Sequence, residues 1–186
     1  LGGAQAGVRI DYRLNPSGKN PVFAYGRASS ALYSPRSEEL AVGLVWRPGT
    51  PLPVSLGVER RIAVGRGARN AFAIIATTGI GPMDIAPGVR VEGYGQAGVV
   101  GVRRRDAFVD GRVALTHPIA NTPFSAGVSV SGGAQPNVSR LDVGPVIDAR
   151  IKLKGVQPRL SVEWRERVAG NAAPNSGPAV TLATDF

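Results

Sequence analysis

The residues best suited to catalysis are one histidine and two serines that follow it. His117 stands in Thr116-His117-Pro118, and Ser125 and Ser129 lie downstream. A nucleophilic serine needs a base within hydrogen-bond reach, so this set would indicate a hydrolase. The segment around Ser129, however, does not match a nucleophile elbow, which needs a strand-to-helix turn. We therefore expect His117 to be a turn residue and the chain not to be an enzyme, with a hydrolase as the alternative.

Paired carboxylates are the second candidate chemistry. Asp142 with Asp148, or Glu59 with Glu92, could in principle do acid–base work. Basic residues share their strand faces, so charge pairing is the simpler interpretation. One His and no Cys exclude a multi-histidine centre and Cys-type metal sites. We expect no metal and no cofactor.

A glycine triplet also resembles a dinucleotide-binding motif in its spacing. No helix-like pattern follows these glycines, so we reject that interpretation; they are Gly93, Gly95 and Gly98.

The arginines give the chain its basic character, with 22 Lys+Arg against 13 Asp+Glu and a sequence pI near 11.0. Such a balance often indicates a nucleic-acid partner, but aromatic stacking platforms and a recognised binding motif are missing, so we expect none. Guanidinium groups also form bidentate contacts with phosphate and carboxylate. Solvated turns are the alternative for the candidate anion-binding arginines, which are Arg66, Arg69, Arg103, Arg104 and Arg105.

The elements that must position these residues are strands. Helical apolar spacing is not sustained anywhere, whereas apolar and polar residues alternate with period two, as in Val8, Ile10 and Tyr12 against Arg9 and Asp11. Eleven strands are predicted, at 4–14, 22–33, 39–47, 53–64, 71–80, 88–102, 107–116, 123–132, 140–153, 158–168 and 178–186.

Short Gly- and Pro-rich segments separate the strands, which predicts an all-β antiparallel up-and-down meander. The strands are longer than those of most soluble sheets, and about ten residues are what a tilted strand needs to cross a bilayer. Eleven such strands would leave exposed edges unless the sheet closes. We therefore predict one transmembrane β-barrel domain over residues 1–186.

The composition of the two faces favours a membrane barrel over a soluble sandwich. The apolar face is Val, Ile, Leu, Ala and Gly, which would pack a thick core poorly but suits a band facing lipid. The charges would then turn inward, where opposite signs can pair in a polar lumen. The residues expected in the lumen are Arg9, Asp11, Arg13, Arg27, Glu59, Arg61, Arg90, Glu92, Asp110, Arg112, Asp142, Asp148, Arg150, Lys152, Arg159, Glu163, Arg165 and Arg167.

Aromatic residues and the end of the sequence support the same interpretation. Tyr12, Trp46, Phe124 and Phe186 fall near strand ends at one rim, and Phe72 falls at the other, as in an interfacial girdle. The last strand alternates through Val180 and Leu182 and stops at Phe186. This resembles the terminal signature strand of bacterial outer-membrane barrels, which implies recognition by the outer-membrane assembly machinery.

The direction of each strand then follows from placing Phe186 at the periplasmic end. Residues 1–14 would run toward the periplasm, and single-chain outer-membrane barrels have even strand counts. We therefore expect at least one strand upstream of Leu1 and twelve or more in the complete barrel. The loops expected on the outer side are 34–38, 65–70, 103–106, 133–139 and 169–177.

Three longer segments extend this resemblance, at residues 94–101, 134–145 and 164–170. They look like the C-terminal portion of alphaproteobacterial outer-membrane proteins, in which a periplasmic tetratricopeptide region often precedes the barrel. Similar architectures include exopolysaccharide exporters and bacteriophage-adsorption barrels. The resemblance implies fold and location but transfers no site residue.

These observations predict a non-enzymatic barrel of the bacterial outer membrane that acts as a pore, export channel or anchor. Its expected partners are the lipid bilayer, lipopolysaccharide, the assembly machinery and an anionic polymer such as exopolysaccharide. The alternatives are a structural or adhesion barrel with a lumen plugged by Arg–carboxylate pairs, a soluble secreted all-β binding protein, and an outer-membrane hydrolase.

Overall fold

The computed structural model describes residues 5–31, 38–51, 53–64, 70–101, 105–151 and 158–183. Within these ranges the chain is all-β, as predicted, and contains no helix long and apolar enough to cross a membrane. The strands are β1 (Gln5–Arg13), β2 (Val22–Ala31), β3 (Glu38–Trp46), β4 (Val54–Ala63), β5 (Ala71–Ala86), β6 (Val89–Val100), β7 (Asp106–Pro118), β8 (Phe124–Gln135), β9 (Val138–Arg150), β10 (Arg159–Gly170) and β11 (Gly177–Ala183).

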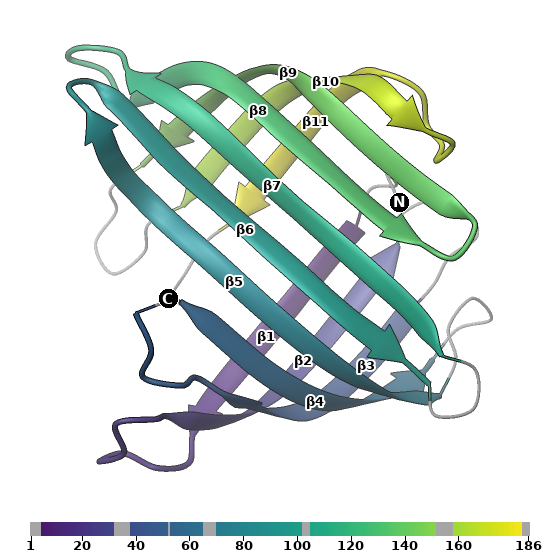
Figure 1. Cartoon of the computed structure of the whole chain (residues 1–186). Coiled ribbons are helices and arrows are strands. Elements are labelled where there is room, and N and C mark those ends of the chain that lie inside the picture. The colour runs from purple at the N-terminus through teal and green to yellow at the C-terminus, as the bar shows by residue number, and fades with distance from the viewer. Residues whose placement is uncertain are drawn as a thin grey trace. The chain divides into compact units, whose positions relative to one another are not determined.

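The strands form one antiparallel up-and-down sheet, in which each strand pairs with its neighbours in sequence (Figure 1). The registers follow directly from hairpin connections, with Val8 opposite Ala28 and Gly26 opposite Val42. Among the described residues the hydrogen-bonded order ends at β1 and β11. The meander is therefore confirmed, and closure into a barrel stays a prediction.

Two compact units can be distinguished within the sheet. The first comprises Leu1–Thr78, Gly95–Val109 and Gln135–Asn137, and the second comprises Gly79–Tyr94, Asp110–Ala134 and Val138–Phe186. Each unit contains its own cluster of charged side chains, so each is described separately below.

The burial of side chains is inverted relative to a soluble sheet. Large apolar residues such as Ile10, Leu44 and Ile74 are exposed, whereas Glu59 and Glu163 are buried. We call the side that carries the exposed Val, Ile and Leu the apolar face, and the side that carries the buried charges the polar face. Their alternation along each strand follows the period of two in the sequence.

Most of the buried apolar residues lie on the polar face and are small. In the first unit Ala71, Ala73 and Val100 form a buried cluster, with Ile75 and Phe108 packed against it. Gly98 leaves room for this contact, because a side chain there would meet the ring of Phe108 and the carbonyl of Ile74.

Strand β5 is longer than the sequence pattern predicts. The segment Gly81-Pro82-Met83-Asp84 was expected to be a turn, but β5 continues through it to Ala86. The register between β4 and β5 ends at Val54 opposite Thr78, so among the described residues the later part of β5 has no partner on its β4 side. Proline lacks an N–H and is tolerated at such an edge, which explains how Pro82 can remain in the strand.

The predicted outer loop 133–139 is also wrong. Strand β8 extends to Gln135 and β9 begins at Val138, so only Pro136 and Asn137 connect them. Asn137 adopts a positive φ of 66°, a conformation that asparagine accepts more readily than most residues and that a tight hairpin turn requires. Sequence composition alone did not distinguish this turn from a longer loop.

Candidate functional site

The charged cluster of the first unit is built across three strands. Tyr25 on β2, Gly43 on β3 and Glu59 on β4 are successive register partners. Because Gly43 has no side chain, the ring of Tyr25 crosses β3, and its hydroxyl donates a hydrogen bond of 2.8 Å to Glu59 Oε2. An added Cβ at Gly43 would lie 2.8 Å from that ring.

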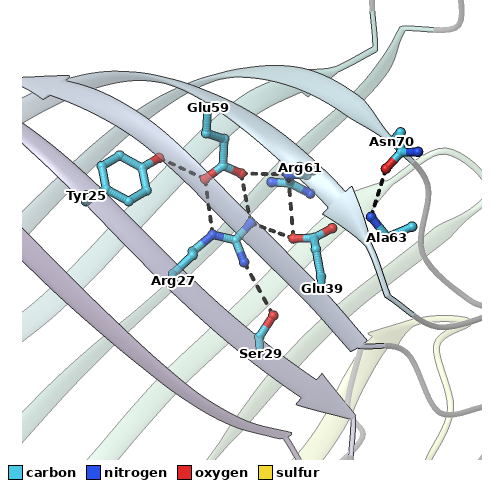
Figure 2. A network of polar contacts seen from close by, with 8 residues as sticks. All are labelled: Tyr25, Arg27, Ser29, Glu39, Glu59, Arg61, Ala63 and Asn70. Carbon is cyan, nitrogen blue, oxygen red and sulfur yellow. Dashed lines mark hydrogen bonds and ion pairs between the residues drawn. The ribbon is translucent and has the colours of Figure 1, made fainter.

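Glu59 is the centre of this cluster (Figure 2). Arg27 donates from Nε to Glu59 Oε2 at 3.1 Å and from Nη2 to Glu59 Oε1 at 2.8 Å, while Arg61 Nε donates to the same Oε1 at 2.6 Å. Arg27 Nη2 also bonds Glu39 Oε1 at 2.6 Å. Both arginines therefore share two carboxylates over the small residue Ala41, their register partner on β3.

The remaining charges predicted for this face lie on β1. Arg9 Nε donates to Asp11 Oδ1 at 2.9 Å, and its guanidinium carbon lies 3.8 Å from the centre of the Tyr25 ring, a cation–π contact. Arg13 instead donates to the carbonyl oxygens of Asn15 and Gly18, so it fixes the turn between β1 and β2.

In the second unit, one group of charges surrounds Glu163 on β10. Its Oε2 accepts from Arg112 Nε at 3.1 Å and from the Ser129 hydroxyl at 2.8 Å, and its Oε1 accepts from Arg165 Nε at 2.7 Å. These donors come from β7, β8 and β10. The buried carboxylate thus connects three strands. Its hydrogen bonds to the arginines are charge-assisted and therefore stronger than hydrogen bonds between neutral groups.

A second group in this unit surrounds Glu92 on β6. Arg150 Nη2 pairs with Glu92 Oε2, and Arg159 Nη2 lies 2.8 Å from Glu92 Oε1. Arg112 Nη1 is 3.7 Å from the same Oε1, and Arg159 Nε is 4.0 Å from Asp148 Oδ1. Three guanidinium groups therefore converge on a single carboxylate.

Two further predicted charges have simple partners. Arg90 Nε bonds Asp84 Oδ1 at 3.0 Å near the β5–β6 turn, and Asp110 hydrogen bonds with Tyr94.

Arginines also hold the segment between β10 and β11. Arg140 pairs with Asp142 and donates from Nη1 to the Pro174 carbonyl at 2.6 Å. Arg167 donates to the Ala172 carbonyl at 2.6 Å and to Asn175 Oδ1 at 2.7 Å. The segment between β10 and β11, which the sequence assigns to an outer loop, is thus held by hydrogen bonds from arginines of β9 and β10.

The catalytic alternative lacks the necessary geometry. His117 lies on the apolar face with Val113 and Leu115, and its ring adjoins Gly88. Ser129 lies on the polar face, bonded to Glu163. No hydrogen bond joins His117 to a serine within the described ranges, and these ranges contain no cluster of three or more His, Asp or Glu able to hold a metal ion.

Several sequence predictions fall on other parts of the chain. Arg105 is exposed beside β7, whereas Arg66, Arg69, Arg103, Arg104, Lys152 and Phe186 lie outside the described residues. Val180 and Leu182 are exposed on the apolar face, as the terminal pattern predicts. Tyr12, Trp46, Phe72 and Phe124 are exposed as well.

Four residues with specific contacts were not identified from the sequence, three on the polar face and one on the apolar face. Tyr25, Glu39 and Arg140 complete the ion-pair clusters, and their parity along β2, β3 and β9 was the available signal. Arg60 lies on the apolar face, with its guanidinium carbon 4.7 Å from the centre of the Phe72 ring.

Comparison with known proteins gives no further guide, because no protein-family model and no curated protein sequence matches the chain.

Proposed function

We propose that the chain is a non-enzymatic, membrane-spanning β-barrel of the bacterial outer membrane that acts as a pore, export channel or anchor. In this proposal it contacts an anionic polymer such as exopolysaccharide or lipopolysaccharide. Its other partners are the lipid bilayer and the machinery that assembles outer-membrane barrels.

The inversion of the two faces carries the proposal. Leu44, Val58 and Ile74 are adjacent register partners on β3, β4 and β5, and their exposed fractions are 47%, 51% and 67%. A soluble protein would leave this apolar surface in water, at a cost of about 25 cal/mol per Å². Large contiguous apolar patches generally mark contact with a protein or a membrane. A bilayer covers such a face without needing complementary side chains.

The buried charges on the polar face fit the same architecture. Membrane barrels alternate apolar residues toward lipid with polar residues toward the lumen. Opposite charges placed there can pair, as they do around Glu59, Glu92 and Glu163. A soluble sandwich would instead place its large apolar side chains between the sheets.

A second candidate function, a structural or adhesion barrel with a plugged lumen, is favoured by one observation. The carboxylates of the clusters are almost fully buried and each is bound by arginines from more than one strand, as at Glu59 and Glu163. Such cross-links would fill the interior of a narrow barrel and oppose ion flow.

Three measurements test the proposal. Trp46 and Trp164 lie on the apolar face, so in vesicles both should be quenched by lipids brominated on their acyl chains. Recovery of folded protein from the soluble fraction without detergent, with no quenching in vesicles, would refute membrane insertion. Conductance of the refolded chain in planar bilayers would support the pore, and insertion without conductance would support an anchor or a structural barrel with a plugged lumen.

A further inference from the structure

The polar face of the second unit carries an unusual pairing of like charges. Arg150 at the end of β9 and Arg159 at the start of β10 are direct register partners on the same face of the sheet. Like charges placed opposite each other on a sheet are destabilising. Something must therefore offset their repulsion.

The first unit shows how such a pair can be neutralised. Arg9 and Arg27 are also direct register partners. There, however, Arg9 has its own carboxylate in Asp11 and stacks on Tyr25, while Arg27 bonds both Glu39 and Glu59. That pair is supplied with acceptors from within the protein.

The pair in the second unit shares Glu92 as its closest carboxylate. Glu92 contacts Arg150 and Arg159 together, and Arg112 Nη1 is also within 3.7 Å of it. Asp148 Oδ1 is 4.0 Å from Arg159 Nε, which is within reach of an ion pair but beyond hydrogen-bond distance. Both arginines therefore depend on the same carboxylate for close contact, and Asp148 adds a weaker attraction to one of them.

The donors of these arginines are incompletely used. Glu92 Oε1 accepts no hydrogen bond among the described residues although Arg159 Nη2 is 2.8 Å away, which means that the N–H groups of Arg159 do not point at it. In the same part of the chain the buried Nη2 of Arg112 has no acceptor. Each guanidinium carries five N–H donors in a fixed plane, so several remain available.

The two arginine side chains are more exposed to solvent than the carboxylate that they contact. The side chains of Arg150 and Arg159 are 41% and 34% exposed, whereas that of Glu92 is 6% exposed. The accessible surface of this cluster is therefore cationic, even though a carboxylate lies beneath it. The register partner of Arg159 on β11 is Ala183, whose side chain is only a methyl group.

From this geometry we infer that Arg150 and Arg159 form a binding site for an oxyanion group, a phosphate or a carboxylate, presented on the polar face. Guanidinium groups bind both by paired, charge-assisted hydrogen bonds. Glu92 holds the two arginines in place from below, and the bound anion accepts hydrogen bonds from their exposed N–H groups. The inference rests on the proposed function for its setting, since a polymer entering the polar interior would carry such groups.

Titration calorimetry on the full refolded chain tests the site, with inorganic phosphate, oligogalacturonate and neutral dextran oligomers as separate probes. About 0.15 M NaCl limits long-range attraction, because the Debye length is then about 8 Å. We expect binding of phosphate, oligogalacturonate or both, and none of dextran. Phosphate alone would indicate a phosphorylated partner such as a lipid headgroup, and oligogalacturonate alone a carboxylated polysaccharide.

Matched variants separate a built site from general attraction. R150Q and R159Q should each weaken anion binding about tenfold or more. R150K and R159K keep the charge needed by Glu92 but lose the paired geometry, so they should fold and bind with intermediate affinity. R60Q removes the same charge from the apolar face and should bind like the wild type.

The outcome does not depend on membrane insertion. Absence of anion binding, or equal loss in R60Q and R159Q, would overturn the site even if the protein inserts into bilayers. Conversely, a protein that stays soluble yet loses anion binding specifically in R150Q and R159Q would overturn the membrane proposal and retain the site.

Discussion

Glu59 should be the side chain on which the stability of the first unit depends most. Its carboxylate is 1% exposed and accepts hydrogen bonds from Tyr25, Arg27 and Arg61. The substitution E59Q keeps the shape of the side chain but removes the charge. Arg27 and Arg61 would then share Glu39 alone, and Arg61 Nε is 3.9 Å from it.

The expected loss can be bounded from the geometry. Removing one partner of a buried ion pair typically costs about 3–5 kcal/mol. The side chains of Arg27 and Arg61 are 22% and 20% exposed, and Glu39 still bonds Arg27. Water and Glu39 therefore recover part of that loss. We expect E59Q to lower the free energy of unfolding by about 2–3 kcal/mol.

Urea unfolding of the refolded protein, followed by tryptophan fluorescence, measures this change. With a slope of about 2 kcal/mol per M, the midpoint should fall by about 1 M or more. E38Q is the control, because it removes the same charge from an exposed position on β3. Y25F should lose less, about 1–2 kcal/mol, since Arg27 still donates to Glu59 Oε2. An E59Q midpoint equal to that of E38Q would refute the idea that Glu59 holds this cluster together.

Three other predictions use the same protein. G43A should lower unfolding stability by about 1–3 kcal/mol because its Cβ would meet Tyr25 and the Val58 carbonyl, whereas G26A, with open space around it, should change stability little; equal urea midpoints would contradict this. I74R should abolish or slow insertion into vesicles and I74V should not, since Arg near the bilayer midplane costs about 2–4 kcal/mol; normal flotation of I74R with vesicles would argue against a lipid-facing β5. R167Q should speed hydrogen exchange in residues 171–176 with little effect on the urea midpoint, whereas R140Q should also lower the midpoint because it leaves the buried Asp142 without its arginine; unchanged exchange in both variants would show that these arginines do not hold the segment.

The strands could be predicted because their signal is local. Val8, Ile10 and Tyr12 alternate with Arg9 and Asp11, and the burial of side chains follows the same period along the chain. The ends of the strands were predicted less well, because they depend on pairing with neighbouring strands as well as on local composition. The Gly-Pro pair at Gly81-Pro82 suggests a turn, yet β5 continues, since no β4 residue in the described part of the chain needs an N–H from Pro82.

The ion-pair clusters could be predicted only as a set of candidates. The sequence identifies Arg27 and Glu59 as residues of one face but does not contain the register that brings them together across β3. The role of Gly43 depends on that register as well, because only the crossing of the Tyr25 ring makes a side chain at position 43 unacceptable. The pairing of Arg150 with Arg159 likewise depends on how β9 and β10 align.

Beyond Thr78, β5 has no β4 partner among the described residues, and this has a consequence for the behaviour of the protein before and after folding. A free strand edge offers a row of N–H and C=O groups that another polypeptide can extend, which is a common route to aggregation. Pro82 interrupts that row because it has no N–H, and Gly81 beside it disfavours a regular strand. The same residue that made this segment look like a turn therefore protects the extended hairpin from pairing with a second molecule.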